Sequence, residues 1–286
     1  MNFVLHLIQA LLPVTLFSAE EGVIHVTSEA YELPAATERR GVPREKERHG
    51  FEAVVFEESG YITSFAPRVV DGDGEVLPGD FLHHWVVGDI DAETPGCEAH
   101  GHDFAPLIAA GGELTGFDLP EGYGIPVEGE RKYMAQSMFG NPTELDRSDV
   151  VFEAEIGFAP EGAELTALYP VWLDVDAECS EHGWRVPANT VETTTRTVTF
   201  PFDGTLHFAG AHLHDEARVL ELRTPEGEVL ISVSPTLGDG TAKTEAFVGP
   251  LTVEADREYV LEVVYENPAA HAIDAMGIVY ALVEPS

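Results

Sequence analysis

Two histidines separated by one residue are the strongest chemical signal in the sequence. His212 and His214 follow a β-rich segment that spans residues 197–210. Side chains two residues apart on a strand point to the same face of a sheet. Two imidazoles on one face form a metal chelate, so the sequence predicts a metal-binding pair here. The alternative for this pair taken alone is the polar outward face of an exposed sheet.

Further candidate ligands lie elsewhere in the chain. His83 and His84 form an adjacent pair, and Met138 and Met276 are two of only four methionines. Imidazole and thioether donors together favour copper, although Met276 taken alone is a typical core residue. Adjacent residues diverge on a regular strand, so His83 and His84 can share a metal only if a β-bulge or twist turns both rings to one side.

The composition excludes several classes of function. Asp and Glu number 51 against 15 Lys and Arg, for a net charge of -36. Such a chain repels phosphate backbones, and we expect no nucleic-acid partner. The acidic residues are spread along the chain, which indicates a strongly hydrated surface. No Ser-His-Asp order, phosphate-binding glycine loop or HExxH motif is present, so hydrolase and nucleotide chemistry lack a motif.

The N-terminal segment and the cysteines predict export. Residues 1–19 are largely apolar and end before Glu20 and Glu21, which is typical of a signal peptide, although basic residues are missing. No later segment has the apolar length of a membrane span. We therefore expect a secreted or periplasmic protein with no membrane contact after signal removal. The only cysteines, Cys97 and Cys179, are expected to form a disulfide in that compartment.

Short β-branched and aromatic runs, separated by Gly, Pro, Asp and Asn turns, fill the chain after Phe51. No stretch keeps a helical period. This pattern predicts an all-β fold of two tandem antiparallel β-sandwich, jelly-roll-like domains. We place the first domain at residues 20–188 and the second at residues 189–286, with one histidine pair in each.

Two hairpins are predicted in the second domain. The first joins residues 219–223 to residues 228–233 through a turn in which Pro225 and Gly227 supply the dihedrals. The second joins residues 251–254 to residues 259–265. Both alternate apolar and polar residues, as a sheet with one buried face requires.

The order of the candidate ligands resembles that of the copper type II, ascorbate-dependent monooxygenases, which include the peptidylglycine and dopamine β-monooxygenases and their stress-up-regulated nodulin relatives. In that family, an adjacent histidine pair and a third ligand hold one copper, and His-x-His with a later methionine holds the other. The residues in matching places are His83 and His84 for the first copper, and His212, His214 and Met276 for the second. The similarity covers roughly residues 80 to 283 and includes residues 119–127, which match the segment before the third ligand of the first copper.

The resemblance implies a copper-dependent monooxygenase that hydroxylates an aliphatic C–H bond of a small-molecule or peptide substrate. It implies two copper ions, O2 as co-substrate and a reductant such as ascorbate, with catalysis at the centre of His212, His214 and Met276. Tyr280 matches a substrate-contacting tyrosine of the family. The arginine that peptide-hydroxylating members place two residues before His-x-His is Gly210 here, so a peptide ending in glycine is not the expected substrate.

The first copper site departs from the family at its third ligand. Where the family has a histidine after Gln-x, this chain has Met138. Either Met138 ligates through its thioether, which would favour Cu(I), or it packs in its strand and the site is weakened or completed by another histidine such as His100 or His102. The alternative function is therefore a non-catalytic secreted copper-binding protein of the same fold. A β-sandwich adhesion module with incidental histidines is a third interpretation.

Overall fold

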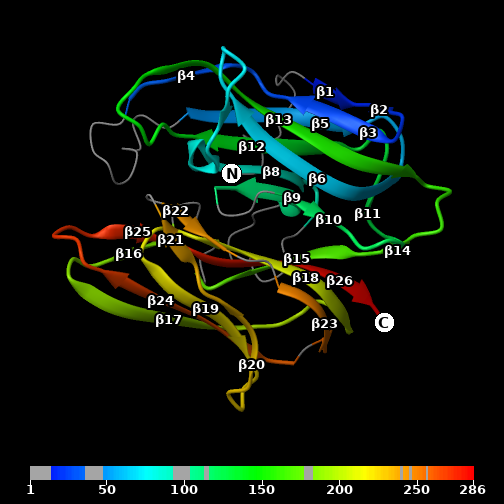
Figure 1. Cartoon of the computed structure of the whole chain (residues 1–286). Coiled ribbons are helices and arrows are strands. Elements are labelled where there is room, and N and C mark those ends of the chain that lie inside the picture. Colours follow the sequence, from blue (N-terminus) through cyan, green and yellow to red (C-terminus); the bar gives the residue numbers. More distant parts are fainter. Residues whose placement is uncertain are drawn as a thin grey trace. The chain divides into compact units, whose positions relative to one another are not determined.

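The computed structural model describes residues 14–35, 48–92, 104–112, 116–176, 183–238, 241–244, 247–255 and 257–286. Over these residues the regular elements are β-strands, apart from one short 3-10 helix, η2 (Gly79–Phe81) (Figure 1). The predicted all-β class is confirmed. The described part of the chain contains no helix with the length and apolar character needed to cross a membrane.

The chain divides into two compact units. Unit 1 comprises Met1–Asp91 and Pro106–Leu168, and unit 2 comprises Ala92–Ala105 and Tyr169–Ser286. This division falls earlier than the boundary predicted between residues 188 and 189. The reason is that β15 (Tyr169–Asp174) pairs with the C-terminal strand β26 (Gly277–Pro285), which makes it part of a sheet in unit 2.

Unit 1 contains a five-stranded and a nine-stranded sheet. The five-stranded sheet has the order β1 (Val14–Phe17), β5 (Arg48–Phe56), β12 (Lys132–Phe139), β8 (Leu82–Asp89) and β9 (Ala105–Gly111). The main path of the larger sheet runs through β14 (Thr166–Ala167), β11 (Tyr123–Val127), β6 (Gly60–Val70), β13 (Arg147–Pro160), β3 (Val23–Thr27) and β2 (Ala19–Glu20). Short strands join it at β6 and β13: β7 (Val76–Leu77), β10 (Phe117–Asp118) and β4 (Tyr31–Leu33).

Aromatic side chains join the two sheets of unit 1. Trp85 on β8 stacks between Phe65 on β6 and Phe152 on β13, with ring centroids 5.6 and 4.6 Å away. All three side chains are almost fully buried. Because side chains alternate along a strand, the residue before Trp85 points away from this core. That residue is His84.

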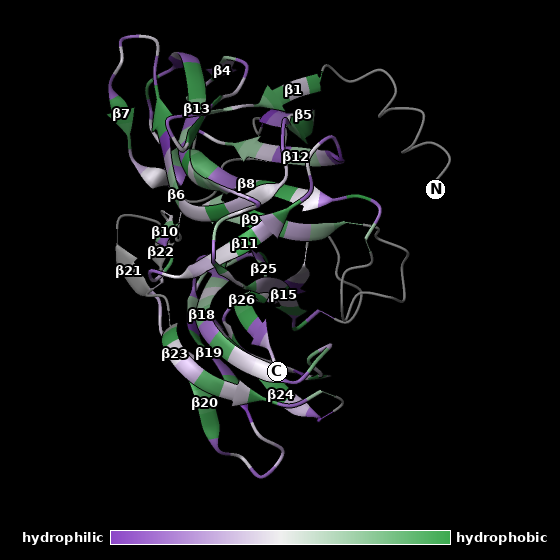
Figure 2. Cartoon of the chain, turned by 90° about the vertical axis from the view of Figure 1, so that its right-hand side faces the viewer, coloured by the Kyte–Doolittle hydropathy of each residue, from purple (hydrophilic) through white to green (hydrophobic). Residues whose placement is uncertain are grey.

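Unit 2 contains two four-stranded sheets with a shared hydrophobic core. The first has the order β15, β26, β18 (Gly204–Leu213) and β23 (Phe247–Val253). The second has the order β17 (Thr190–Val198), β24 (Tyr259–Asn267), β19 (Ala217–Arg223) and β20 (Val229–Val233). Two-stranded ribbons complete the unit: β16 (Trp184–Val186) with β25 (Ile273–Ala275), and β21 (Thr236–Gly238) with β22 (Thr241–Lys243). Hydrophobic residues recur along the strands of both units (Figure 2), as the predicted pair of jelly-roll-like sandwiches requires.

One of the two predicted hairpins is confirmed. Strands β19 and β20 pair across a turn in which Gly227 has a φ of +93°, a conformation that favours glycine. The second hairpin is wrong, because β23 pairs with β18 in one sheet while β24 pairs with β17 and β19 in the other. Apolar and polar residues alternate along both strands because each strand turns one face to the same core. This alternation does not show which strand is the pairing partner.

Strand β1 lies inside the segment predicted to be a signal peptide. It pairs with β5 from Val14 opposite Ala53 to Phe17 opposite Phe56. The ring of Phe17 is 2% exposed and meets that of Phe56 edge-on, with centroids 5.3 Å apart. Cleavage after Ala19 would therefore remove a strand whose last side chain is in the core.

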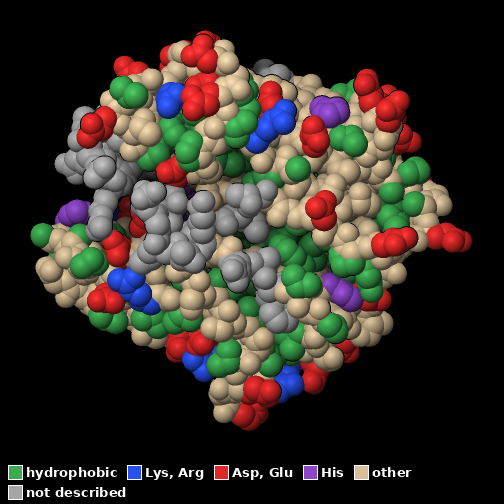
Figure 3. Space-filling view, viewed as in Figure 1, with side chains coloured by type: hydrophobic (Ala, Val, Ile, Leu, Met, Phe, Trp, Pro, Cys, Tyr) green, Lys and Arg blue, Asp and Glu red, His purple; other side chains and the backbone are tan. Residues whose placement is uncertain are grey.

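The acidic excess is distributed over the surface. On the face shown in Figure 3, carboxylates are scattered among polar and apolar side chains, with few Lys and Arg between them. Several of the described arginines form ion pairs, such as Arg68 with Glu153 at 2.7 Å and Arg131 with Asp89 at 2.6 Å. This distribution agrees with the hydrated surface predicted from the sequence.

Candidate metal centres

The adjacent histidines of unit 1 lie at a β-bulge. Leu82 is paired with Phe139 and His84 with Met138, so the register shifts and His83 is the extra residue on β8. The two residues of a bulge can direct their side chains to one side of the sheet. The ring centroids of His83 and His84 are 5.4 Å apart. The bulge that joint ligation requires is therefore present.

Met138 lies directly opposite His84 on the neighbouring strand β12. Its neighbours Ser137 and Phe139 are buried, whereas Met138 is half-buried. The alternation of β12 thus places the thioether on the outer face of the five-stranded sheet, beside His84, and outside the sandwich core. His100 and His102, the alternative donors for this site, lie outside the described residues.

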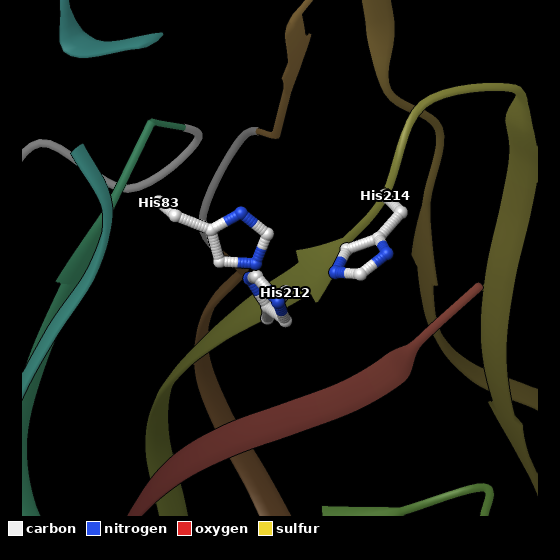
Figure 4. A group of neighbouring side chains, drawn as sticks. All are labelled: His83, His212 and His214. Carbon is white, nitrogen blue, oxygen red and sulfur yellow. The ribbon is translucent and has the colours of Figure 1, made fainter. Parts of the chain in front are cut away.

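The His-x-His pair of unit 2 lies at the end of β18. His212 is the second-last residue of the strand and His214 follows it directly. Their ring centroids are 5.3 Å apart and the rings are nearly perpendicular, at 89° (Figure 4). Both residues are half-buried. The two imidazoles therefore lie close together, as a pair that shares a metal requires.

Met276 lies at the same end of this sheet, directly before β26, the strand next to β18. Leu213 pairs with Gly277 in the antiparallel register. His214 follows Leu213 and Met276 comes before Gly277, so the two candidate ligands lie at the same end of the ladder. The hydroxyl oxygen of Tyr265 accepts hydrogen bonds from the backbone N–H groups of His214, at 3.0 Å, and of Met276, at 3.2 Å. One buried hydroxyl therefore holds the backbones of both candidate ligands.

A buried carboxyl group shares the sheet face of His212. Asp174 and His212 are both paired with Ile278, one from β15 and one from β18, so the three side chains form a row. Burial raises the pKa of the Asp174 carboxyl to about 7, although a hydrogen bond from the backbone of Asp176 and attraction to Arg196 and His212 lower it. This group can hold or release a proton near neutral pH.

Tyr280 lies two residues along from Ile278 on the same face. It is paired with Gly210 on β18 and Trp172 on β15, and its ring meets that of Trp172 edge-on at 6.4 Å. The side chain is 4% exposed, and burial raises the pKa of its hydroxyl. Gly210 is itself buried, and it occupies the position at which the resemblance places an arginine in peptide-hydroxylating enzymes.

Sequence reasoning missed Asp174 and Tyr265. An aspartate at the outward phase of a strand is normally hydrated, so nothing in the pattern indicated that Asp174 is 6% exposed. Tyr265 could have been noticed, because it lies at the inward phase of β24 and a buried tyrosine hydroxyl requires a hydrogen-bond partner. Cys97 and Cys179, predicted to form a disulfide, lie outside the described residues.

Comparison with known proteins places the chain in no family. No protein-family model and no curated protein matches the sequence. Among solved structures, the chain is similar to a recombinant N-glycanase F (PNGase F), with a TM-score of 0.47 and 10% identity over 93% of this chain and 97% of that chain. It is also similar to the major capsid protein P2 of bacteriophage PM2, with a TM-score of 0.38 and 11% identity over 92% of this chain and 98% of that one. Similarity this distant assigns no function.

Proposed function

We propose that this protein is a copper-dependent monooxygenase-like protein that hydroxylates an aliphatic C–H bond of a small substrate, with O2 and a reductant such as ascorbate. The observation that carries the proposal is the donor set of each unit. In each, two imidazoles lie close together at one end of a sheet, with a methionine on the neighbouring strand in unit 1 and directly before it in unit 2. The order of these ligands along the chain resembles the order in the family described above.

The donors fit copper better than other common metals. Imidazole suits several transition metals, but a thioether is a soft ligand that selects Cu(I). Calcium and magnesium require oxygen ligands instead. Copper held by His83, His84 and Met138 in unit 1, and by His212, His214 and Met276 in unit 2, would supply the one-electron redox chemistry that such a reaction with O2 needs.

The residues around the second centre would bind the substrate and control protons. Tyr280 and Trp172 place aromatic rings on the sheet face that carries His212, and Gly210 adds no charged side chain between them and His212. Asp174, with its pKa near 7, would hold a proton on the same face. An apolar or aromatic substrate without a carboxylate fits these side chains, because the arginine that would pair with a carboxylate is missing.

Copper content and oxygen consumption test the proposal. The purified chain should retain two copper ions after loosely held metal is removed, and should consume O2 in the presence of ascorbate beyond the rate of free copper. Replacing His214 with Ala should abolish this consumption and remove one copper. Replacing His271 with Ala is the matched control, because that histidine is exposed in the same unit. If His214→Ala kept the fold and consumed oxygen as fast as the parent, the proposal would be wrong.

The donor set also supports a second candidate function. Thioether ligands stabilise Cu(I), the form that copper carriers and stores bind, and the first centre has Met138 where the family has a histidine. A non-catalytic exported copper-binding protein would show the same copper content but no ascorbate-dependent oxygen consumption. It would also be insensitive to changes at Tyr280, which contributes no metal donor.

A further inference from the structure

A third histidine lies in the same row as Met138 and His84. Met138 is paired with His84 on one side, on β8, and with His49 on the other, on β5. Directly paired residues of antiparallel strands place their side chains on the same face. His49, Met138 and His84 therefore form one row across three neighbouring strands of unit 1.

This row faces away from the core. The adjacent row contains Gly50, Ser137 and Trp85, which are buried between the two sheets. Because side chains alternate along each strand, the row of His49 occupies the outer face. His83 joins this face through the bulge, with its ring 5.4 Å from that of His84.

The spacing allows both flanking histidines to reach a metal above Met138. Neighbouring strands are about 4.8 Å apart, and directly paired Cβ atoms are roughly 4.5 to 5.5 Å apart. Rotation of both imidazoles toward the central thioether would bring His49 and His84 to one point from opposite directions. Three imidazoles and one thioether would then be available on one sheet face.

From this arrangement we infer that His49 is a ligand of the copper centre in unit 1, together with Met138, His84 and His83. The inference rests on the proposed copper binding, but not on catalysis. It explains how a site with methionine in place of the third histidine keeps three nitrogen donors, because the missing imidazole comes from the next strand. Soft sulfur with imidazole donors makes Cu(I) the preferred ion.

Paired substitutions of His49 distinguish ligation from packing. The full-length chain carrying His214→Ala would be used, so that copper bound at the first centre is measured without the second. His49→Leu and His49→Met are similar in size and hydrophobicity, but only methionine offers a donor. His25→Leu is the control, because His25 is an exposed strand histidine of the same unit.

Competition with a chromophoric Cu(I) chelator gives the affinity, and X-ray absorption gives the number of nitrogen and sulfur ligands. We expect His49→Leu to weaken Cu(I) binding by at least ~10-fold, on the scale of losses seen at metal sites. His49→Met should recover much of the loss and add a sulfur ligand, and His25→Leu should bind like the parent. The inference would be overturned if His49→Leu and the parent had the same Cu(I) affinity and the same number of nitrogen ligands. That result would still leave His84 and Met138 as proposed copper ligands. A parent that binds no copper at this centre would overturn both the inference and the proposed first site.

Discussion

Tyr265 and Met276 exchange two hydrogen bonds. The tyrosine hydroxyl donates to the carbonyl oxygen of Met276 at 2.5 Å and accepts from its backbone N–H at 3.2 Å. Tyr265 belongs to β24, in the sheet opposite the one that carries the candidate ligands, and it is 1% exposed. Since the same oxygen also accepts from the backbone N–H of His214, the packing of the two sheets sets the spacing of two ligands.

Replacing Tyr265 with Phe should loosen this spacing. The change leaves buried backbone groups of His214 and Met276 without their partner, which costs about 1–3 kcal/mol per group in unfolding free energy. Loss of an orienting group at a metal site typically lowers metal affinity by ~10–100-fold. We therefore expect a lower Tm of the metal-free protein and weaker Cu(I) binding at the second centre, measured by thermal denaturation and chelator competition.

Tyr259 provides the control for this experiment. Its side chain is equally buried, on the same strand, and its hydroxyl accepts a hydrogen bond from the backbone N–H of Glu254 at 3.0 Å. Tyr259→Phe should lower stability without changing copper affinity. If both variants bound copper like the parent, Tyr265 would be a structural residue only.

Asp174 should make stability depend on pH. Its folded-state pKa of about 7 lies above the ordinary value of 3.8, so between these values the folded chain holds a proton that the unfolded chain releases. The stabilising contribution of the neutral carboxyl is complete below pH 3.8 and is lost as the pH rises through 7. The expected change is roughly 1.4 kcal/mol for each pH unit within this window.

Asp174→Asn should remove that part of the pH dependence. The variant should gain stability relative to the parent as the pH rises from 4 to 7, in denaturant titrations with a chelator present. The charged and titratable groups acting on Asp174 are Asp176, Arg196 and His212. If the stability of Asp174→Asn changed with pH as steeply as that of the parent, other groups would cause the pH dependence. His212 would be the first of these to test, with the variant His212→Gln.

The sequence predicted the class of fold. It also indicated most of the candidate ligands, whose binding of a metal stays a prediction, but it did not specify which strands place them side by side. Alternation of apolar and polar residues identifies a strand because it indicates one buried face. The hairpin predicted between β23 and β24 was wrong because the two strands belong to different sheets that bury a face in the same core. The common direction of His212 and His214 follows from spacing alone. The row of His49 and Met138 depends on which strands pair, which residue types do not specify.

The mature N-terminus should lie before Val14 if the chain is exported. Phe17 is buried against Phe56, and truncating a buried phenylalanine costs about 3–5 kcal/mol. Removing residues 1–19 would delete Phe17 together with strand β1. The intact mass of the exported protein locates the cleavage. A mature chain that begins at Glu20 and is as stable as the longer one would show that β1 is dispensable.

Deleting His83 tests the bulge that brings the two adjacent imidazoles together. Leu82 is paired with Phe139 and His84 with Met138, so removal of the residue between them leaves a regular ladder on both sides. The core side chains of β8 should keep their faces, and the unfolding free energy should change by no more than ~1 kcal/mol, as for a change outside the core. The copper affinity of the first centre should fall, because one imidazole is lost.

Deleting Val87 from the same strand is the opposite case. Val87 is regularly paired with Ala135 and is fully buried. Its removal shifts the register by one residue, so that side chains on one side of the deletion exchange core and outer faces. That variant should unfold or lose several kcal/mol in denaturant titrations. If deletion of His83 were as damaging as deletion of Val87, His83 would be part of a regular ladder, and its ring would not share the outer face with that of His84.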